Sequence, residues 1–136
     1  MTTTTDPKPR RGLFVMAGIV LWLAGVAVIR LLGPVVHDGG VAHMLFWAAN
    51  VAAGALTIVV LARVSGRSRH AMVVPAVTVA MPAMLMDGVA VTLDTLGITH
   101  IYADTPAMAA FAGGTLLFAF WSALFFALLW HRPRAS

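Results

Sequence analysis

The chain has 136 residues with a formal net charge of +4, and its mean hydropathy is +0.91. Hydrophobic residues make up 60% of it and charged residues only 10%, whereas a soluble domain carries about 25% charged residues. This composition excludes an ordinary soluble domain. The apolar residues form long runs that do not alternate with polar ones, so they predict membrane-spanning helices rather than the strands of a barrel.

Four apolar segments reach the length of about 20 residues that a helix needs to cross a bilayer. In chain order they are residues 13–36, 41–62, 71–96 and 106–130. The connections between them are too short to fold separately, so we expect one domain over residues 12–131. Residues 1–11 are polar and broken by proline, which predicts a disordered cytoplasmic tail, and residues 132–136 form a second cytoplasmic tail. The predicted fold class is all-α, a four-transmembrane-helix bundle.

The basic residues predict the orientation of this bundle. Arg30 is the one basic residue inside a segment, and the other eight of the nine lysines and arginines fall on one side of a four-helix path: Lys8, Arg10, Arg11, Arg63, Arg67, Arg69, Arg132 and Arg134. The positive-inside rule makes that side cytoplasmic, so both termini are predicted to be cytoplasmic. We expect a multi-pass membrane protein, with the lipid bilayer as a partner and no nucleic acid.

The first segment has one alternative reading, a cleaved signal peptide with the small residues Gly25 and Ala27 at the cleavage site. Its apolar run continues beyond Arg30, which favours a spanning helix. We therefore expect it to be the first helix of the bundle.

Small and polar residues recur at seven-residue intervals, the spacing that keeps one seam toward the neighbours in a left-handed bundle. The seams are Gly18 and Gly25 in the first segment, His43, Asn50 and Thr57 with Gly54 in the second, Asp87 and Asp94 in the third, and Thr115 and Ser122 in the fourth. We interpret the uncharged seams mainly as packing surfaces. The fourth segment also has two overlapping small-xxx-small pairs, Ala109 with Gly113 and Ala110 with Gly114, which indicate close helix approach inside the bundle or in a homodimer.

Asp87 is the most informative residue, because the run of the third segment that surrounds it is otherwise uncharged. A carboxylate at that depth costs roughly 2.5–3.5 kcal/mol on insertion scales, so it needs a partner or a function. Arg30 is its expected partner, since each of the two residues lies roughly 9–14 Å below the outer end of its own helix at 1.5 Å per residue. Extension of Arg30 to the headgroups is the open alternative. We predict a buried polar focus made of Arg30, Asp87, Asp94, Asn50 and His43.

The sequence argues against cofactor chemistry. It has no cysteine, which excludes thiolate metal sites and iron–sulfur clusters, and no lysine within a segment that could form a Schiff base. His43 lies near a segment edge rather than at the mid-membrane depth that a haem ligand needs. The other titratable groups gather at the predicted outer face without the spacing of a metal motif: His37, Asp38, His43, Asp94, His100, Tyr102 and Asp104. We predict no catalytic residue, no metal and no cofactor.

Pro82, Met84, Leu85 and Asp87 form a Pro-x-Met-Leu-x-Asp run in the third segment. At this run, and in residues 22–33 of the first segment, the chain resembles an uncharacterised family of small bacterial four-helix membrane proteins, catalogued as a domain of unknown function. The resemblance covers residues 13–130 and implies the four-helix fold and a place in the bacterial inner membrane, without any activity. The chain is also similar in size to small multidrug transporters, but their essential carboxylate is in the first helix, and this chain contains no glutamate.

Two functions from different classes remain. We expect a non-catalytic bundle, an accessory or interaction protein, in which a pair of Arg30 and Asp87 locks the packing and a second copy of the chain forms a homodimer. The alternative is a small proton-linked transporter in which Asp87 changes charge and reaches water from both sides. An enzyme with a metal held by the outer histidines and aspartates is a weaker alternative, and the sequence indicates no particular substrate.

Overall fold

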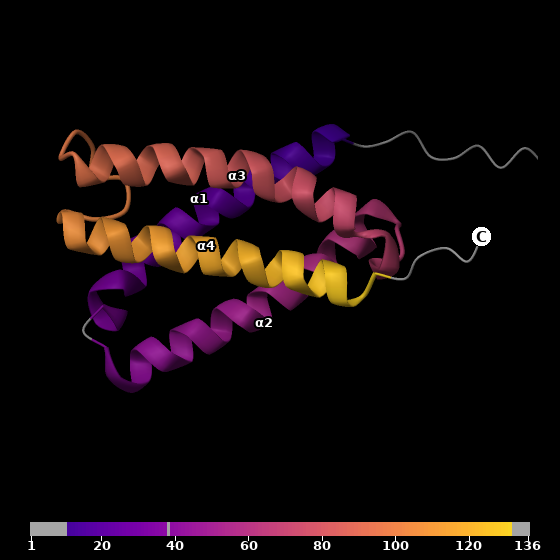
Figure 1. Ribbon diagram of the computed structural model, residues 1–136, viewed down its shortest axis with the longest axis horizontal. Coiled ribbons are helices and arrows are strands. Elements are labelled where there is room, and N and C mark those ends of the chain that lie inside the picture. Colours follow the sequence, from indigo (N-terminus) through magenta and orange to yellow (C-terminus); the bar gives the residue numbers. More distant parts are fainter. Residues whose placement is uncertain (1–10, 38, 132–136) are drawn as a thin grey trace, which may run out of the picture.

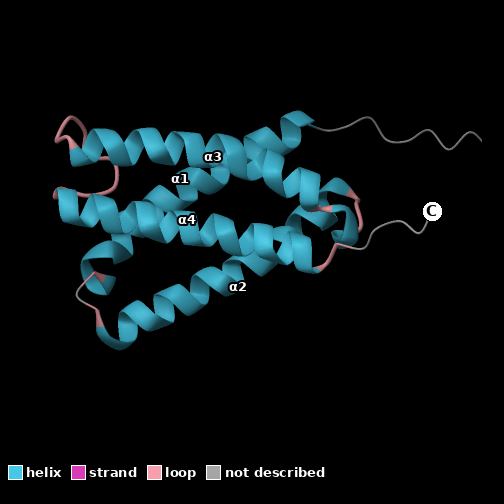
Figure 2. Cartoon of the chain, in the orientation of Figure 1, coloured by secondary structure: helices cyan, strands magenta, loops and turns pink. Residues whose placement is uncertain are grey.

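The computed structural model describes residues 11–37 and 39–131, and every regular element in those residues is helical (Figure 2). The elements are α1 (Arg11–Val36), α2 (Gly40–Ser65), the short 3-10 helix η1 (Arg69–Ala71), α3 (Val73–Thr95) and α4 (Pro106–Leu129). The prediction of an all-helical fold with four long helices is confirmed, and each predicted boundary lies within three residues of the observed one. Residues 1–10 and 132–136 of the predicted tails and Asp38 lie outside the described residues, and Arg11, predicted to belong to the first tail, begins α1.

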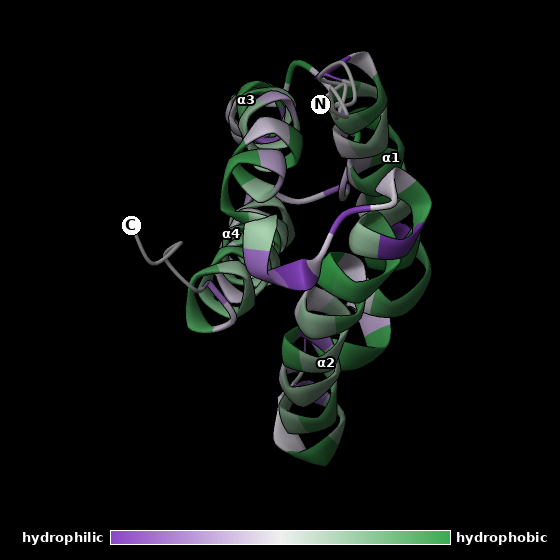
Figure 3. Ribbon diagram, turned by 90° about the vertical axis from the view of Figure 1, so that its right-hand side faces the viewer, coloured by the Kyte–Doolittle hydropathy of each residue, from purple (hydrophilic) through white to green (hydrophobic). Residues whose placement is uncertain are grey.

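All four long helices are apolar enough and long enough to cross a membrane. Their outward surfaces are apolar as well: Leu31, Val74 and Met44 are 76%, 74% and 72% exposed. In Figure 3 most of the helical ribbon has the colour of hydrophobic residues, and hydrophilic residues lie mainly near the helix ends. A surface of this kind is stable in hydrocarbon and not in water. The protein is therefore a multi-pass membrane protein.

The helices form two layers of two (Figures 1 and 3). In one layer α3 and α4 lie side by side, and in the other α1 packs on α3 while α2 packs on α4. Direct contact between α1 and α2 is sparse. An apolar groove remains between these two helices, with α3 and α4 as its floor.

Two glycines set the close approach of the packed pairs. A Cβ atom at Gly18 of α1 would collide with the backbone carbonyl of Val79 on α3, and one at Gly54 of α2 would collide with the hydroxyl of Ser122 on α4. Gly18 and Gly54 are thus packing contacts, as small residues between helices usually are. Other members of the same predicted seams line the groove: Gly25, Asn50 and Thr57.

The two small-xxx-small pairs of α4 serve different surfaces. Ala109 is fully buried, and a Cβ atom at Gly113 would lie 3.1 Å from the side chain of Val91 on α3. Ala110 and Gly114 are exposed, and a Cβ atom at Gly114 would meet nothing within 4 Å. One pair therefore packs inside the chain and the other is left on its surface.

The two ends of the bundle differ in charge. We call the end with residues 96–105 the acidic end, because it carries Asp94 and Asp104. The opposite end, which holds residues 66–72 and the arginines Arg11, Arg63, Arg67 and Arg69, is called the basic end. In Figure 1 the start of α1 and the end of α4 both lie at the basic end, as expected for an even number of spans.

Candidate functional site

The loop between α3 and α4, residues 96–105, folds back into the bundle at the acidic end. Gly97 has a φ of 72°, and its N–H donates to the carbonyl of Asp94 (3.0 Å) while the N–H of Ile98 donates to the carbonyl of Leu93 (2.9 Å). This is the arrangement with which a left-handed glycine ends a helix and reverses the chain. The returning loop then brings Tyr102 into the interior, where it is 1% exposed.

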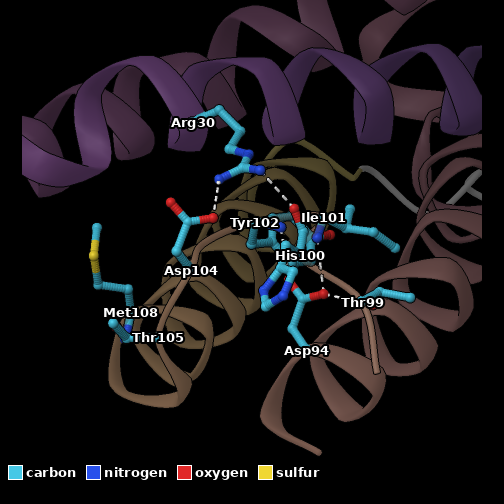
Figure 4. Close-up of polar contacts among 9 residues, drawn as sticks. All are labelled: Arg30, Asp94, Thr99, His100, Ile101, Tyr102, Asp104, Thr105 and Met108. Atoms are coloured by element: carbon cyan, nitrogen blue, oxygen red, sulfur yellow. Dashed lines mark hydrogen bonds and ion pairs between the residues drawn. The ribbon is translucent and has the colours of Figure 1, made fainter. Parts of the chain in front are cut away.

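Asp94 holds the returning loop with both of its carboxylate oxygens (Figure 4). One oxygen accepts the hydroxyl of Thr99 (2.6 Å) and the N–H of Ile101 (2.8 Å), and the other accepts the N–H of Tyr102 (2.7 Å). Asp94 is buried. Hydrogen bonds to an ionised carboxylate are roughly twice as strong as those between neutral groups. Asp94 therefore fixes the backbone of the loop against the end of α3.

Tyr102 links the loop to Asp87, which lies two helical turns deeper on the same face of α3. The phenol hydroxyl donates to Oδ1 of Asp87 and accepts the indole N–H of Trp22 on α1 at 2.7 Å. An indole nitrogen can only donate, so the direction of the Trp22 bond is fixed. Asp87 is 2% exposed. This Trp22–Tyr102–Asp87 chain ties α1, the loop and α3 together at one point.

Apolar side chains surround the phenol: Ile29, Ala90, Ala112 and Leu116 are buried in the same cluster as Tyr102. Burial, followed by the hydrogen bond to Asp87, raises the pKa of Tyr102 well above its ordinary value of about 10. The phenol thus stays protonated throughout the physiological range. It can therefore act as the permanent donor to Asp87.

Arg30 and Asp87 have different partners in the structure, and the predicted pair between them is wrong. Arg30 pairs with Asp104 at 3.2 Å and donates to the backbone carbonyl of His100 at 2.7 Å (Figure 4). The side chains of Arg30 and Asp104 are 42% and 82% exposed. The long arginine side chain reaches the loop at the acidic end, which agrees with the alternative of extension toward the headgroups. Asp87 has the phenol of Tyr102 as its hydrogen-bond partner.

The remaining members of the predicted polar focus, His43 and Asn50, lie on α2 and outside the Tyr102 network. His43 contacts the carbonyl of Val36 through Nδ1 at 3.1 Å and packs on the ring of Phe111. The amide of Asn50 donates to the carbonyl of Phe46 at 2.8 Å. The five predicted residues are therefore divided among three places: the two aspartates under the loop, Arg30 above them, and the two α2 residues elsewhere.

Sequence reasoning missed the roles of Tyr102 and Trp22. Tyr102 is the single tyrosine of the chain and stands in a short loop between two spans, where a solvated residue is the usual expectation. The feature of the sequence that could have indicated these roles is the second carboxylate of the third segment, Asp94. Two aspartates on one face of a helix need several donors, and a short loop with free N–H groups at the end of that helix can supply them.

The site does not resemble a metal centre or a familiar catalytic constellation. Among residues 11–37 and 39–131, no group of three or more histidines, aspartates or other ligating side chains is placed to hold a metal ion. No protein-family model, curated protein or solved structure matches this chain. The resemblance to the uncharacterised four-helix family therefore stays a prediction, and the function has to be argued from the geometry.

Proposed function

We propose that this protein is a non-catalytic integral membrane protein, an accessory or interaction protein of a bacterial inner membrane. The observation that carries the proposal is the enclosure of Asp87, which is 2% exposed beneath a phenol that is itself 1% exposed. A carboxylate that transports protons must exchange them with water on both sides. The hydrogen bond from Tyr102 supports a different role for Asp87, which is to hold the 96–105 loop inside the bundle.

Proton-linked transport is the second candidate, because the Trp22–Tyr102–Asp87 chain leads from the loop toward a carboxylate within a span. A proton relay needs groups that both accept and donate. Tyr102 meets this requirement, but the indole of Trp22 only donates and so ends the chain. The geometry therefore favours the structural role.

A flux measurement separates the two candidates. The wild type, Asp87→Asn and the control Asp104→Asn, which changes a carboxylate at the exposed acidic end, are reconstituted in liposomes that contain a pH-sensitive dye. We expect the same proton flux for all three proteins and for empty liposomes under an imposed pH gradient. A flux that is present in the wild type and the control but lost in Asp87→Asn would establish the transporter.

We also propose a homodimer through the exposed pair Ala110 and Gly114, since close approach of two helices requires small residues on the surface. Gly114→Leu should abolish cross-linked dimers in native membranes without unfolding the chain. Gly113→Leu is the contrasting variant, because Gly113 packs against Val91 inside the chain and its replacement should destabilise the monomer. Unchanged cross-linking in Gly114→Leu would remove this interface.

The cytoplasmic placement of the basic end is likewise a proposal, supported by its arginines and the positive-inside rule. The chain has no cysteine, so single cysteines can report accessibility directly. An impermeant thiol reagent added to intact cells should label His37→Cys at the acidic end and leave Ser68→Cys at the basic end unlabelled. The reverse pattern would invert the orientation.

A further inference from the structure

At the basic end, two histidines brace the 66–72 loop against the end of α4. Nδ1 of His70 contacts the carbonyl of Trp130 at 2.6 Å, and Nδ1 of His131 contacts the carbonyl of His70 at 3.1 Å. A carbonyl oxygen only accepts, so the histidine nitrogen carries the hydrogen in both contacts. The two bonds run in opposite directions and hold the loop beside Trp130. The Tyr102 network at the other end of the bundle has no part in this brace.

The braced loop places the guanidinium of Arg69 over the indole ring of Trp130. The guanidinium carbon lies 5.7 Å from the ring centroid, within the distance of about 6 Å at which a cation is attracted to an aromatic ring. Arg69 is also exposed. A guanidinium that stacks on a ring keeps the N–H donors at its edge available, and two of them in parallel match two oxygens of a phosphate. Arg69 is therefore positioned for a phosphate group.

The charges around Arg69 favour an anion and disfavour a cation. Three further arginines lie at the same end of the bundle: Arg11, Arg63 and Arg67. In residues 11–37 and 39–131 the carboxylates lie elsewhere, with Asp87 and Asp94 beneath the 96–105 loop and Asp104 within it. No carboxylate of these residues therefore neutralises the basic end. Its positive potential attracts anions and repels ammonium groups.

The length of α4 places Trp130 at the level of the lipid headgroups. The helix has 24 residues and spans about 36 Å at 1.5 Å per residue, whereas the hydrocarbon core is about 30 Å thick. The ends of α4 therefore lie a few Å outside the hydrocarbon, in the layer where tryptophan is enriched in membrane proteins. Trp130 directly follows the last residue of α4. The phosphates at this level belong to the phospholipids of the surrounding leaflet.

We propose that Arg69, stacked on Trp130, is a headgroup site for an anionic phospholipid, one whose headgroup carries a phosphodiester and no cation. The guanidinium donates two hydrogen bonds to the phosphodiester oxygens. The neighbouring arginines disfavour a zwitterionic headgroup, because they repel its ammonium group. The site lies at the opposite end of the bundle from the Tyr102 network, so it does not depend on the proposed role of Asp87.

Titration of the whole protein with phosphatidylglycerol in a neutral detergent, followed by native mass spectrometry, tests the site with matched variants. Arg69→Gln and Arg63→Gln each remove one positive charge from the basic end, but only Arg69 lies over Trp130. Attraction by surface charge alone weakens by about fivefold for each arginine removed. We expect a loss of this size in Arg63→Gln. The loss in Arg69→Gln should be about 50-fold, since hydrogen bonds to a charged group are worth a further factor of about 10. Equal losses would overturn the proposal.

Two further measurements separate this site from simple charge and from a soluble phosphate ligand. Arg69→Lys keeps the charge but loses the planar pair of donors, so it should weaken phosphatidylglycerol by about tenfold and leave the weaker binding of phosphatidylcholine unchanged. Wild-type affinity in Arg69→Lys would contradict the site. Inorganic phosphate at millimolar concentration should not displace the lipid. Displacement would identify soluble phosphate as the ligand and would overturn the lipid proposal.

Discussion

Two short loops connect helices at opposite ends of the bundle, and they differ in how far they enter it. Residues 96–105 enter the interior and bury Tyr102 and Ala103, whereas residues 66–72 stay on the surface apart from the fully buried Met72. In the surface loop the N–H of Ala71 donates to the carbonyl of Ser68 at 2.9 Å, and the N–H of Arg67 donates to the carbonyl of Ala62 on α2 at 2.9 Å. The inner position of residues 96–105 depends on α3, which offers two carboxylates beneath them.

This difference shows what a loop needs in order to be buried in a membrane protein. Backbone N–H groups that leave water must find acceptors, and an ionised carboxylate offers several acceptor positions at one place. Asp94 accepts the backbone of the loop and Asp87 accepts its tyrosine. At the basic end, His70 contacts the carbonyl of Trp130 at the end of α4 and Arg69 lies over the ring of the same tryptophan. The intramembrane carboxylates are thus explained by the loop that they hold.

Removal of the Asp94 charge should have the largest effect on this arrangement. Asp94→Asn keeps the shape of the side chain but replaces one acceptor oxygen with a donor, so the N–H of Tyr102 or Ile101 loses its partner. The N–H that loses its acceptor and the new amide donor that faces it are both unsatisfied, and at about 1–3 kcal/mol for each buried group they predict a loss of about 2–6 kcal/mol in the free energy of unfolding. Unfolding in mixed micelles, followed by circular dichroism, measures this loss. Asp104→Asn is the control, and an equal loss in both variants would contradict the role of Asp94.

The link between Asp87 and Tyr102 should appear as a coupling in a double-mutant cycle. Asp87→Leu and Tyr102→Phe each break the same hydrogen bond, so the double variant should lose about 0.5–3 kcal/mol less than the sum of the single losses. Asp87→Leu combined with Arg30→Leu should instead be additive within about 0.5 kcal/mol, because these residues have different partners. Coupling in the second cycle and none in the first would restore the pair predicted from the sequence.

Titration of the single tyrosine gives a direct test of its burial. The pKa of Tyr102 is raised by burial and by the bond to Asp87, so the folded state keeps a proton that the unfolded state loses above about pH 10. The stabilisation is complete below that pH and is lost as the pH rises above it. The near-ultraviolet absorbance of tyrosinate should therefore stay low in the folded protein above about pH 10 and rise only on unfolding. Ionisation near pH 10 in the folded state would show an accessible phenol.

The all-helical fold class and the bounds of the four helices could be predicted from the sequence, whereas the way the helices pack was not predicted and the site could be predicted only in part. Helix lengths and bounds follow from apolar runs and basic flanks, which are local properties. The burial of Asp87 and Asp94 also follows, because both lie on one face of an apolar helix. Their partners do not follow, since the path of a ten-residue loop through space depends on how α1, α3 and α4 pack. Charge alone favoured Arg30, and a neutral phenol carries no comparable signal.

The surface loop should be less sensitive than the buried one. Nδ1 of His70 contacts the carbonyl of Trp130 at 2.6 Å, and the guanidinium of Arg69 lies 5.7 Å from the ring centroid of the same tryptophan. His70→Ala should therefore cost about 0.5–1.5 kcal/mol, the net value of one hydrogen bond. Hydrogen exchange of the 66–72 loop should increase in this variant while that of the 96–105 loop stays unchanged. A loss as large as that in Asp94→Asn would erase the contrast between the two loops.

The ion pair between Arg30 and Asp104 should contribute least, although it is the one salt bridge in residues 11–37 and 39–131. Both side chains are substantially exposed, and exposed pairs are worth about 0–1 kcal/mol because water and salt screen them. Asp104→Asn should change the free energy of unfolding by no more than this amount, and raising the salt concentration should reduce the difference further. Arg30→Leu should cost slightly more, since Arg30 also donates to the carbonyl of His100. A loss above about 2 kcal/mol in Asp104→Asn, insensitive to salt, would mean that Arg30 rather than the buried carboxylates holds the loop in place.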